Sequence, residues 1–307
     1  MHKERRKSAP DNFKEYQKRI YNGQAKEGAV GFGGLDFYEF NRRCYDVPIH
    51  LKDVKTQKLI RELRIASGST ILDVGCRYGD LLTRLNLVYG TSGVGIDISI
   101  ESLRIASGHQ LEANKYCGAD ADQLPFSDQS FDFVVSFDVL EHLPSPDRCI
   151  AEISRVLKAG GKVLIYAISK NNKYTWHWFL QKISLGRLGK DSGGFGDHFE
   201  DHFIDPRDLS KEMMRNKLKT ERLVCFHSFF TLMFDEIIPK IMWHLIKRLS
   251  RLKISQCTGK QNNFRLPFAL GLYSLLVVLF SPLFEILDKP ISSQGYSNGF
   301  YILAKKT

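Results

Sequence analysis

The chain of 307 residues is long enough to bury a full hydrophobic core, and its hydrophobic (43%) and charged (25%) fractions exclude a disordered chain. Its formal net charge of +10 predicts an acidic partner, either an anionic membrane surface or a nucleic acid. Six cysteines without paired or CxxC spacing argue against a disulfide framework and a zinc site, and they predict a reducing compartment.

Residues 1–66 predict an N-terminal helical cap ahead of a larger domain. The first 20 residues are charged and lack the apolar run that a secretory signal needs. Five glycines within 23–36 predict a mobile loop. Val54, Leu59, Ile60 and Leu63 recur near a 3.6-residue period, which predicts a helix over 51–66.

From residue 67 onward, strand and helix patterns alternate. Short apolar runs separated by stretches with helical spacing predict an α/β fold with a parallel sheet covered by helices on both faces. The predicted strands span 70–75, 93–98, 131–137 and 162–168, and the predicted helices span about 79–88, 100–113 and 146–158.

The pattern changes after residue 170. The polar and aromatic residues 171–204 predict a lid insertion, whose aromatic side chains line an apolar tunnel or form the lid's own core. Asp205 and Pro206 form a favourable N-cap and N1 pair for a helix to about residue 217. Further strands are predicted over 220–228 and 299–306. The predicted organisation is a cap (1–66), a core (67–230), a helical insertion (231–293) and a last core strand (294–307).

The segment ILDVGCRYGD (71–80) lies where the first predicted strand turns into a helix. In an open α/β sheet, ligands bind beyond the carboxyl ends of the strands. Glycine lets the backbone approach a ligand closely, but Gly75 and Gly79 stand four residues apart, so the GxGxxG fingerprint of dinucleotide-binding proteins is absent. The second strand ends in Asp97, whose carboxylate can accept hydrogen bonds from both hydroxyl groups of a ribose.

Two later segments complete a recognisable pattern: GADADQLPFSDQSFDFVVSFDVLEHL (118–143) and RVLKAGGKVLIYAIS (155–169). Together with the first segment, they resemble the class I S-adenosylmethionine-dependent methyltransferases, especially the branch acting on small molecules and lipids. The resemblance covers about 67–170 and extends more loosely to 202–228 and 299–306. It implies a Rossmann-like seven-stranded sheet with helices on both faces, and S-adenosyl-L-methionine as the cofactor.

The resemblance also implies which residues contact the cofactor. Matching positions in the family line its methionine part (Asp73, Gly75 and Gly79), hold its ribose (Asp97) and bracket its adenine (Asp120 and Ala121). The strand end at Ser136 and Phe137 passes under the sulfonium. The complete set of implied cofactor residues is Asp73, Gly75, Cys76, Gly79, Asp97, Ile98, Asp120, Ala121, Ser136, Phe137 and His142.

One position departs from the family pattern, because Arg77 stands where the family usually has a third glycine. The Arg77 side chain either crowds the cofactor or points to solvent. The second arrangement is expected with a negative φ, which tolerates a Cβ atom.

A hydroxyl acceptor would need a general base, and histidine suits this role because its pKa lies near neutrality. His142 follows the fourth strand, close to the expected methyl position, whereas His198 and His202 lie in GDHFEDHFIDPRDL on the acceptor side. The alternative is that these histidines cap helices or bind the backbone. No metal site is predicted, because no third histidine or cysteine lies near His198 and His202.

Residues 231–293 combine positive charge with hydrophobic length. The stretch 239–265 contains seven Lys or Arg and no acid, and its spacing predicts a basic amphipathic helix. Residues 266–284 then run 19 residues without a charge, which reaches transmembrane length. Because the last strand must return to the core sheet, we expect this pair to lie in the membrane interface, or to dip in and return, with Pro267, Gly271 and Pro282 breaking or kinking it.

The sequence therefore predicts a peripheral methyltransferase at the cytoplasmic face of a membrane, with a lipid-like, isoprenoid-quinone or lipid-linked glycan acceptor. One alternative is a soluble small-molecule methyltransferase in which 231–293 caps the site or forms a dimer interface. Another is a scaffold that binds the cofactor without turnover. Nucleic acid is disfavoured as a partner, because the positive charge lies beside hydrophobic segments rather than along a polar groove.

Overall fold

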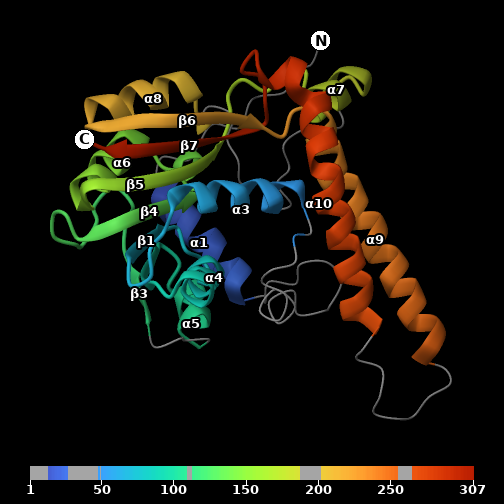
Figure 1. Ribbon diagram of the computed structural model, residues 1–307, viewed down its shortest axis with the longest axis horizontal. Coiled ribbons are helices and arrows are strands. Elements are labelled where there is room, and N and C mark those ends of the chain that lie inside the picture. The colour runs from blue at the N-terminus through green and yellow to red at the C-terminus, as the bar shows by residue number, and fades with distance from the viewer. Residues whose placement is uncertain (1–12, 27–47, 49, 109–112, 187–201, 255–264) are drawn as a thin grey trace.

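The computed structural model describes residues 13–26, 48, 50–108, 113–186, 202–254 and 265–307. Within these ranges, only the backbone is described for 13, 24, 26, 243, 245–254 and 265–270. Seven strands form one sheet in the order β3-β2-β1-β4-β5-β7-β6 (Figure 1). The strands are β1 (Thr70–Val74), β2 (Ser92–Asp97), β3 (Asn114–Gly118), β4 (Phe131–Phe137), β5 (Leu157–Ile168), β6 (Leu218–Phe226) and β7 (Gly299–Lys306).

Helices cover both faces of this sheet, as the sequence predicts. One buried cluster joins the sheet to α6 and α8, and a second joins its other face to α3 and α4. The described helices are α1 (Phe13–Lys26), α3 (Leu51–Leu63), α4 (Asp80–Tyr89), α5 (Ile100–Gly108), the 3-10 turn η1 (Leu140–His142), α6 (Pro146–Val156), α7 (Trp176–Ile183), α8 (Pro206–Arg215), α9 (Phe230–Ile254) and α10 (Arg265–Ser292).

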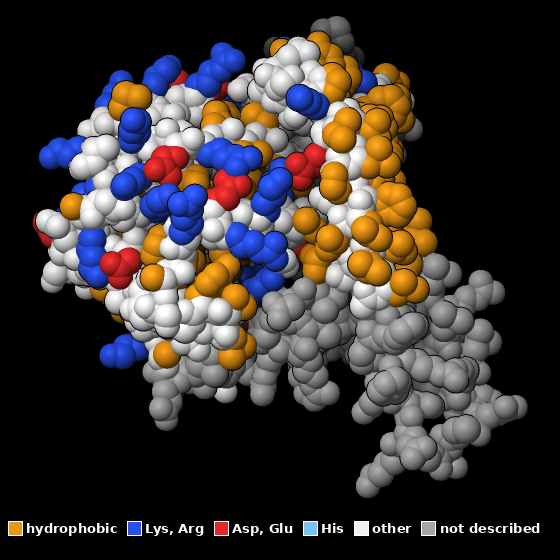
Figure 2. Space-filling view, viewed as in Figure 1, with side chains coloured by type: hydrophobic (Ala, Val, Ile, Leu, Met, Phe, Trp, Pro, Cys, Tyr) orange, Lys and Arg blue, Asp and Glu red, His pale blue; other side chains and the backbone are white. Residues whose placement is uncertain are grey.

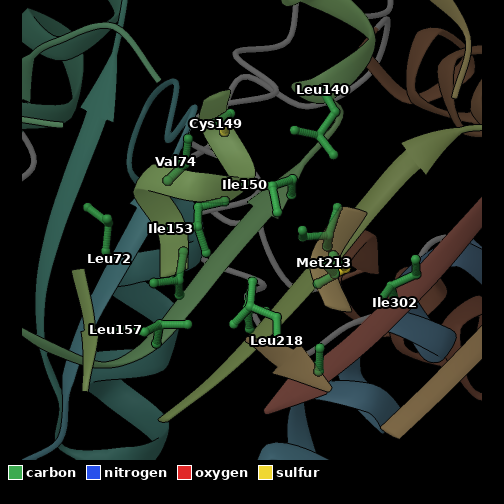
Figure 3. Packing of buried hydrophobic residues seen from close by; sticks show 14 of the residues in the cluster. Leu72, Val74, Leu140, Cys149, Ile150, Ile153, Leu157, Met213, Leu218 and Ile302 are labelled. Atoms are coloured by element: carbon green, nitrogen blue, oxygen red, sulfur yellow. The ribbon is translucent and has the colours of Figure 1, made fainter. Parts of the chain in front are cut away.

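The core follows the two-residue period of a strand. Leu72 and Val74 of β1 pack against α6, where Ile150 and Val156 each lie three residues from Ile153 (Figure 3). Ile71 belongs to the cluster on the opposite face. Asp73 is on the same side of β1 as Ile71 by this alternation. The fold thus places an acid beneath the turn that follows β1.

The parallel sheet predicted for the alternating strands is confirmed for β1, β2, β4 and β5, and the last strand, β7, adds an antiparallel element. This strand pairs antiparallel with both β5 and β6 and lies between them, whereas the other strand pairs are parallel. The sheet is therefore mixed rather than wholly parallel. A parallel β7 would need a crossover that returns it to the amino ends of the sheet, but the helices before it end near the carboxyl end of β6.

Most predicted elements agree with the structure to within a few residues, and the fold prediction is confirmed. The Asp205 carboxylate caps α8 by accepting hydrogen bonds from the backbone N–H groups of Arg207 (2.8 Å) and Asp208 (3.3 Å). The strand β3 is not among the strands that the apolar runs predict. The predicted mobile loop lies outside the described residues after residue 26, and Gly23 falls inside α1.

The helices α9 and α10 form a hairpin that stands beside the core (Figure 1). Of the break or kink expected near Pro267, Gly271 and Pro282, the break is wrong, because α10 continues through all three residues as one helix of 28 residues. A proline in a helix costs one backbone hydrogen bond but does not end the helix when the surrounding chain retains its packing.

Candidate functional site

A cavity opens at the carboxyl ends of β1, β2 and β4. The strands β2 and β3 lie on one side of β1, and β4 and β5 lie on the other, so this is the switch point at which α/β sheets bind ligands. The cavity volume is about 390 Å³, within the range of roughly 300–1,000 Å³ typical of small-molecule sites. Seven of the eleven predicted cofactor residues line it: Gly75, Asp97, Ile98, Asp120, Ala121, Phe137 and His142.

The turn after β1 depends on glycine at two positions. Gly75 and Gly79 both have φ of +78°, a conformation that side chains rarely adopt. A Cβ atom on Gly75 would collide with Val139, and one on Gly79 would collide with the Tyr116 ring. Gly75 N–H donates a hydrogen bond to the Ile96 carbonyl at 2.8 Å, which pins the turn to the end of β2.

Asp97 is held in place by two backbone donors. Its Oδ2 accepts a hydrogen bond from Arg77 N–H at 2.9 Å, and its Oδ1 accepts one from Ser99 N–H at 2.8 Å. Burial raises the pKa of this carboxyl, while the two N–H groups act in the opposite direction. Each oxygen keeps a lone pair beyond its backbone bond, so the group can still accept hydrogen bonds from a diol.

Arg77 lines the cavity rim without filling the cavity. Its side chain is exposed, and its guanidinium carbon lies 4.8 Å from the centroid of the Tyr78 ring. The expectation of a negative φ is wrong, because Arg77 has φ of +49°. Arg77 therefore adopts a left-handed backbone conformation, which glycine adopts more readily than other residues.

Four predicted cofactor residues do not line the cavity. Asp73 (4% exposed) and Cys76 (6%) are buried at the end of β1, and Gly79 is the N-cap of α4. Ser136 is fully buried in β4, and its Oγ has no hydrogen-bond partner among the described residues. These four residues shape the turn and the strand beneath the cavity.

Two buried acids beside the cavity have strongly raised pKa values. Burial, followed by the charge of Asp97, raises the pKa of Asp73 to about 8. Burial, followed by the charge of Asp138, raises the pKa of Glu141 to about 8. Both acids therefore hold a proton at neutral pH, which avoids burying two negative charges.

The helix α1 covers the cavity, and it supplies residues that the sequence analysis missed. Lys14, Gln17 and Tyr21 line the cavity from α1. The Tyr21 ring packs edge-on against the His142 ring, with 5.7 Å between the centroids. The missed signal is the spacing of these residues, at i, i+3 and i+7, which places them on one face of a helix.

Polar contacts hold α1 over the cavity at several points. Lys14 Nζ lies 2.8 Å from each carboxylate oxygen of Asp122 and 3.6 Å from Asp120. Asn22 Oδ1 accepts a hydrogen bond from the Ser99 hydroxyl at 2.9 Å. The helix is thus attached to the loops that follow β3 and β2.

Of the other two predicted catalytic histidines, the structure describes only His202. His202 lies just before the bridge between Ser169 and Ile204 and does not line the cavity. His198 lies outside the described residues. Across the part of the chain that the structure describes, no group of three or more His, Cys, Asp or Glu side chains is arranged to hold a metal ion.

A chain of contacts links the hairpin to the cavity wall. Asp235 of α9 accepts hydrogen bonds from the N–H groups of Leu51 (2.6 Å) and Lys52 (3.0 Å) at the start of α3, and from His227 Nε2 at 2.9 Å. Lys52 Nζ then lies 2.7 Å from Asp138, which lines the cavity. The position of α3 therefore depends on α9.

The cavity suits the cofactor that the sequence predicts. S-adenosylmethionine joins a diol-bearing ribose and a flat adenine to a charged amino acid. Asp97 offers a carboxylate for the diol, and Ile98, Ala121 and Leu143 offer an apolar surface for the base. Gln17 adds an amide that lacks a hydrogen-bond partner among the described residues. The residues present therefore fit this group.

Comparison with known proteins agrees with this geometry. A family model described as a methyltransferase domain matches residues 72–165. The ubiquinone biosynthesis O-methyltransferase of Coxiella burnetii (strain Dugway 5J108-111) is 31% identical over 169 residues, which cover 53% of this chain and 69% of the relative.

Solved structures show the shared fold. Phosphoethanolamine N-methyltransferase 2 of Haemonchus contortus, in complex with S-adenosyl-L-methionine, matches 97% of this chain and 60% of its own, with a TM-score of 0.53 and 16% identity. The [4+2]-cyclase SpnF matches 82% of this chain and 80% of its own, with a TM-score of 0.50 and 18% identity. The fold alone thus hosts more than one reaction, and the sequence relationship decides between them. The chain belongs to the class I S-adenosylmethionine-dependent methyltransferases, and it is an enzyme that takes its methyl group from that cofactor.

Proposed function

We propose that this enzyme methylates a hydroxyl group on a quinone-like or other lipid-like acceptor while it lies on the cytoplasmic face of a membrane. The relative from C. burnetii is named for O-methylation in ubiquinone biosynthesis, which supports this class of acceptor. The observation that carries the proposal is the exposed hydrophobic face of α10.

The helix α10 exposes a hydrophobic side to solvent and buries a mixed side, in which the hydrophobic Tyr273 and Val277 lie among polar residues. Ser274 (7% exposed), Ser281 (3%) and Asp288 (3%) are buried against the rest of the molecule. On the opposite side, six leucines are 41–62% exposed, namely Leu272, Leu275, Leu276, Leu279, Leu283 and Leu287. Figure 2 shows these hydrophobic side chains gathered along α10. Water favours the reverse arrangement, and a contiguous hydrophobic patch marks an interaction surface.

The connections of the hairpin favour a position in the interface over a single crossing. Gly271–Ser292 has a mean hydropathy of 1.6, and its 22 residues are long enough to cross a membrane. However, Phe226 at the end of β6 pairs with Gly299 at the start of β7, so the hairpin leaves and rejoins the sheet at one place. A single crossing would put β7 on the wrong side of the bilayer.

Positive charge near this surface supports an anionic membrane as the partner. The sequence of α9 from 240 to 253 contains five Lys or Arg and no acid. Figure 2 also shows Lys and Arg side chains over the face of the core beside α10. Each basic residue near an anionic leaflet contributes about 1 kcal/mol of attraction, and the cytoplasmic leaflet is the anionic one.

We assign the proton transfer to His142. Bound S-adenosylmethionine supplies an electrophilic methyl group. His142 lines the same cavity and takes the proton from the acceptor hydroxyl, while the Tyr21 ring packed against it fixes the orientation of the imidazole. Asp97 holds the ribose, and Asp120 and Ala121 lie against the adenine. The alignment of the acceptor with the cofactor supplies the larger share of the rate enhancement.

Flotation with vesicles tests the membrane part of this proposal. The full chain is mixed with vesicles that contain phosphatidylglycerol, and the bound fraction is measured for wild type, Leu279→Glu and Leu87→Glu. Leu279 on α10 and Leu87 on α4 are almost equally exposed, at 62% and 60%. We expect Leu279→Glu to lose most of its binding and Leu87→Glu to retain it. Equal binding of the two variants would contradict the proposal, and concentration-dependent dimers without vesicle binding would assign α10 to a second copy of the chain.

A pair of acceptors tests the chemical part. Methyl transfer from labelled cofactor is measured with a prenylated phenol in vesicles and with the same phenol lacking the prenyl chain. We expect faster turnover of the prenylated phenol, and we expect Leu279→Glu to slow that reaction alone. Equal rates for both phenols would favour the soluble small-molecule methyltransferase.

A further inference from the structure

Gln17 presents a buried amide to the cofactor cavity. The side chain is 3% exposed and lines the cavity, and neither Oε1 nor Nε2 has a hydrogen-bond partner among the described residues. Folded proteins rarely leave a buried amide unpaired, because its lost contact with water destabilises the fold. An amide at this place therefore points to a bound molecule that completes its hydrogen bonds.

The contacts of α1 show which part of the cavity Gln17 faces. Three residues before it, Lys14 contacts Asp122 and Asp120 in the loop after β3. Four residues after it, Tyr21 packs against His142 after β4. The strand between β3 and the β1–β4 pair is β2, which ends in Asp97. Gln17 and Asp97 line the same cavity, and Asn22 of the same helix contacts Ser99, two residues after Asp97, so α1 passes close to the end of β2.

We propose that the Gln17 amide binds a ribose hydroxyl of S-adenosylmethionine, so that α1 contributes a binding residue to the cofactor site. A hydroxyl group donates one hydrogen bond and accepts others. An ionised carboxylate only accepts hydrogen bonds, so Asp97 accepts one from the hydroxyl O–H, whereas Gln17 Nε2–H donates one to the hydroxyl oxygen. One ribose hydroxyl would thus donate a hydrogen bond to Asp97 and accept one from Gln17.

This role predicts opposite effects on the two states of the protein. In the cofactor-free state, replacing the amide with an apolar side chain removes two unpaired buried atoms, so the unfolding temperature rises. In the bound state, the same change removes a hydrogen bond, so the affinity falls. A residue that only packs α1 against the core would lower both quantities.

The test uses the full chain and needs no methyl acceptor, so its outcome is separate from the membrane proposal. Calorimetry measures binding of S-adenosylhomocysteine and of 5′-methylthioadenosine, which keeps the ribose and lacks the amino acid. Gln17→Leu and the equally long Gln17→Met are compared with Gln123→Leu, because Gln123 is exposed in the loop after β3. We expect both Gln17 variants to bind both ligands about tenfold more weakly, with a raised unfolding temperature, and Gln123→Leu to match wild type.

Three results would overturn the proposal. Unchanged affinity for both ligands would mean that the amide contacts neither. A loss confined to S-adenosylhomocysteine would assign Gln17 to the amino-acid end of the cofactor. A lowered unfolding temperature in both Gln17 variants would show that the residue only supports the fold.

Discussion

The helices α6 and α10 are both rich in hydrophobic residues, yet only α6 buries most of them. In α6, Cys149, Ile150, Ile153 and Val156 are fully buried, and Asp147 and Arg148 are exposed. In α10, Tyr273 and Val277 are buried beside Ser274, Ser281 and Asp288, whereas the leucines from Leu272 to Leu287 are exposed. The comparison teaches that hydrophobicity alone does not tell which way a side chain points. The surroundings of each helix decide this, and the membrane position proposed for α10 would account for the difference.

The largest effect is expected for Asp97→Ala, which should weaken cofactor binding and leave membrane binding by the hairpin unchanged. Asp97→Ala removes the acceptor of two hydroxyl protons, and each hydrogen bond to a charged group contributes about 1.5–3 kcal/mol. We expect cofactor affinity to fall by about a thousandfold in calorimetry, with vesicle flotation unchanged. Asp208→Ala serves as the control, because Asp208 is exposed on α8. A joint loss of affinity and flotation would show that the two regions are not independent.

A second variant disturbs the hairpin instead of the core. Asp288 of α10 accepts hydrogen bonds from Phe229, Phe230 and Thr231 N–H at 2.8–3.0 Å, and so caps α9 from the neighbouring helix. We expect Asp288→Ala to lower the free energy of unfolding by about 2 kcal/mol in denaturant titration, because it leaves these buried donors unpaired. Asp288→Asn keeps one acceptor oxygen and should lose less. Cofactor affinity should stay within about twofold of wild type, and a larger loss would indicate coupling through Asp235 and Lys52.

The smallest expected effect is a proton released on binding. Burial raises the pKa of Asp73 to about 8 in the cofactor-free protein, so the group is protonated at pH 6–7. A nearby ammonium group favours the ionised form and lowers this pKa. Binding should therefore release up to one proton, and affinity should rise as the pH rises toward 8.

Calorimetry in buffers of different ionisation enthalpy measures this release. Asp73→Asn should abolish most of it. Asp80→Asn is the control, because burial raises the pKa of Asp80 only to about 6, so it is largely ionised at pH 7. Equal release by wild type and Asp73→Asn would place the ammonium group elsewhere.

The sequence predicts the parts of the fold that depend on local pattern. The apolar runs of β1, β2, β4 and β5 mark buried strands, and the turn at Gly75 and the acid at Asp97 mark the cavity between them. The apolar pattern does not predict β3, because its sequence NKYCG has no continuous apolar run. This strand lies at the edge of the sheet and pairs only with β2. Burial on both faces produces the strand signal, and an edge strand lacks it.

The rest depends on contacts between distant segments. No local pattern shows that α1 lies over the cavity, because its contacts with Asp122 and Ser99 join residues 108 and 77 positions apart. The positive φ of Arg77 is also invisible in the sequence, since the surrounding turn, held by Asp97, imposes it. Proline and glycine suggest a break in α10, but packing against α9 and α3 keeps the helix continuous.

The position of β7 has a consequence for the order of events during translation. This strand fills the gap between β5 and β6, but the hairpin precedes it in the chain. The helices α9 and α10 therefore leave the ribosome before β7, which joins β6 to the other strands of the sheet. If the hairpin lies on a membrane as proposed, it can bind lipid before β7 joins the edge strand β6 to the sheet, and the sheet would then be completed at the bilayer surface.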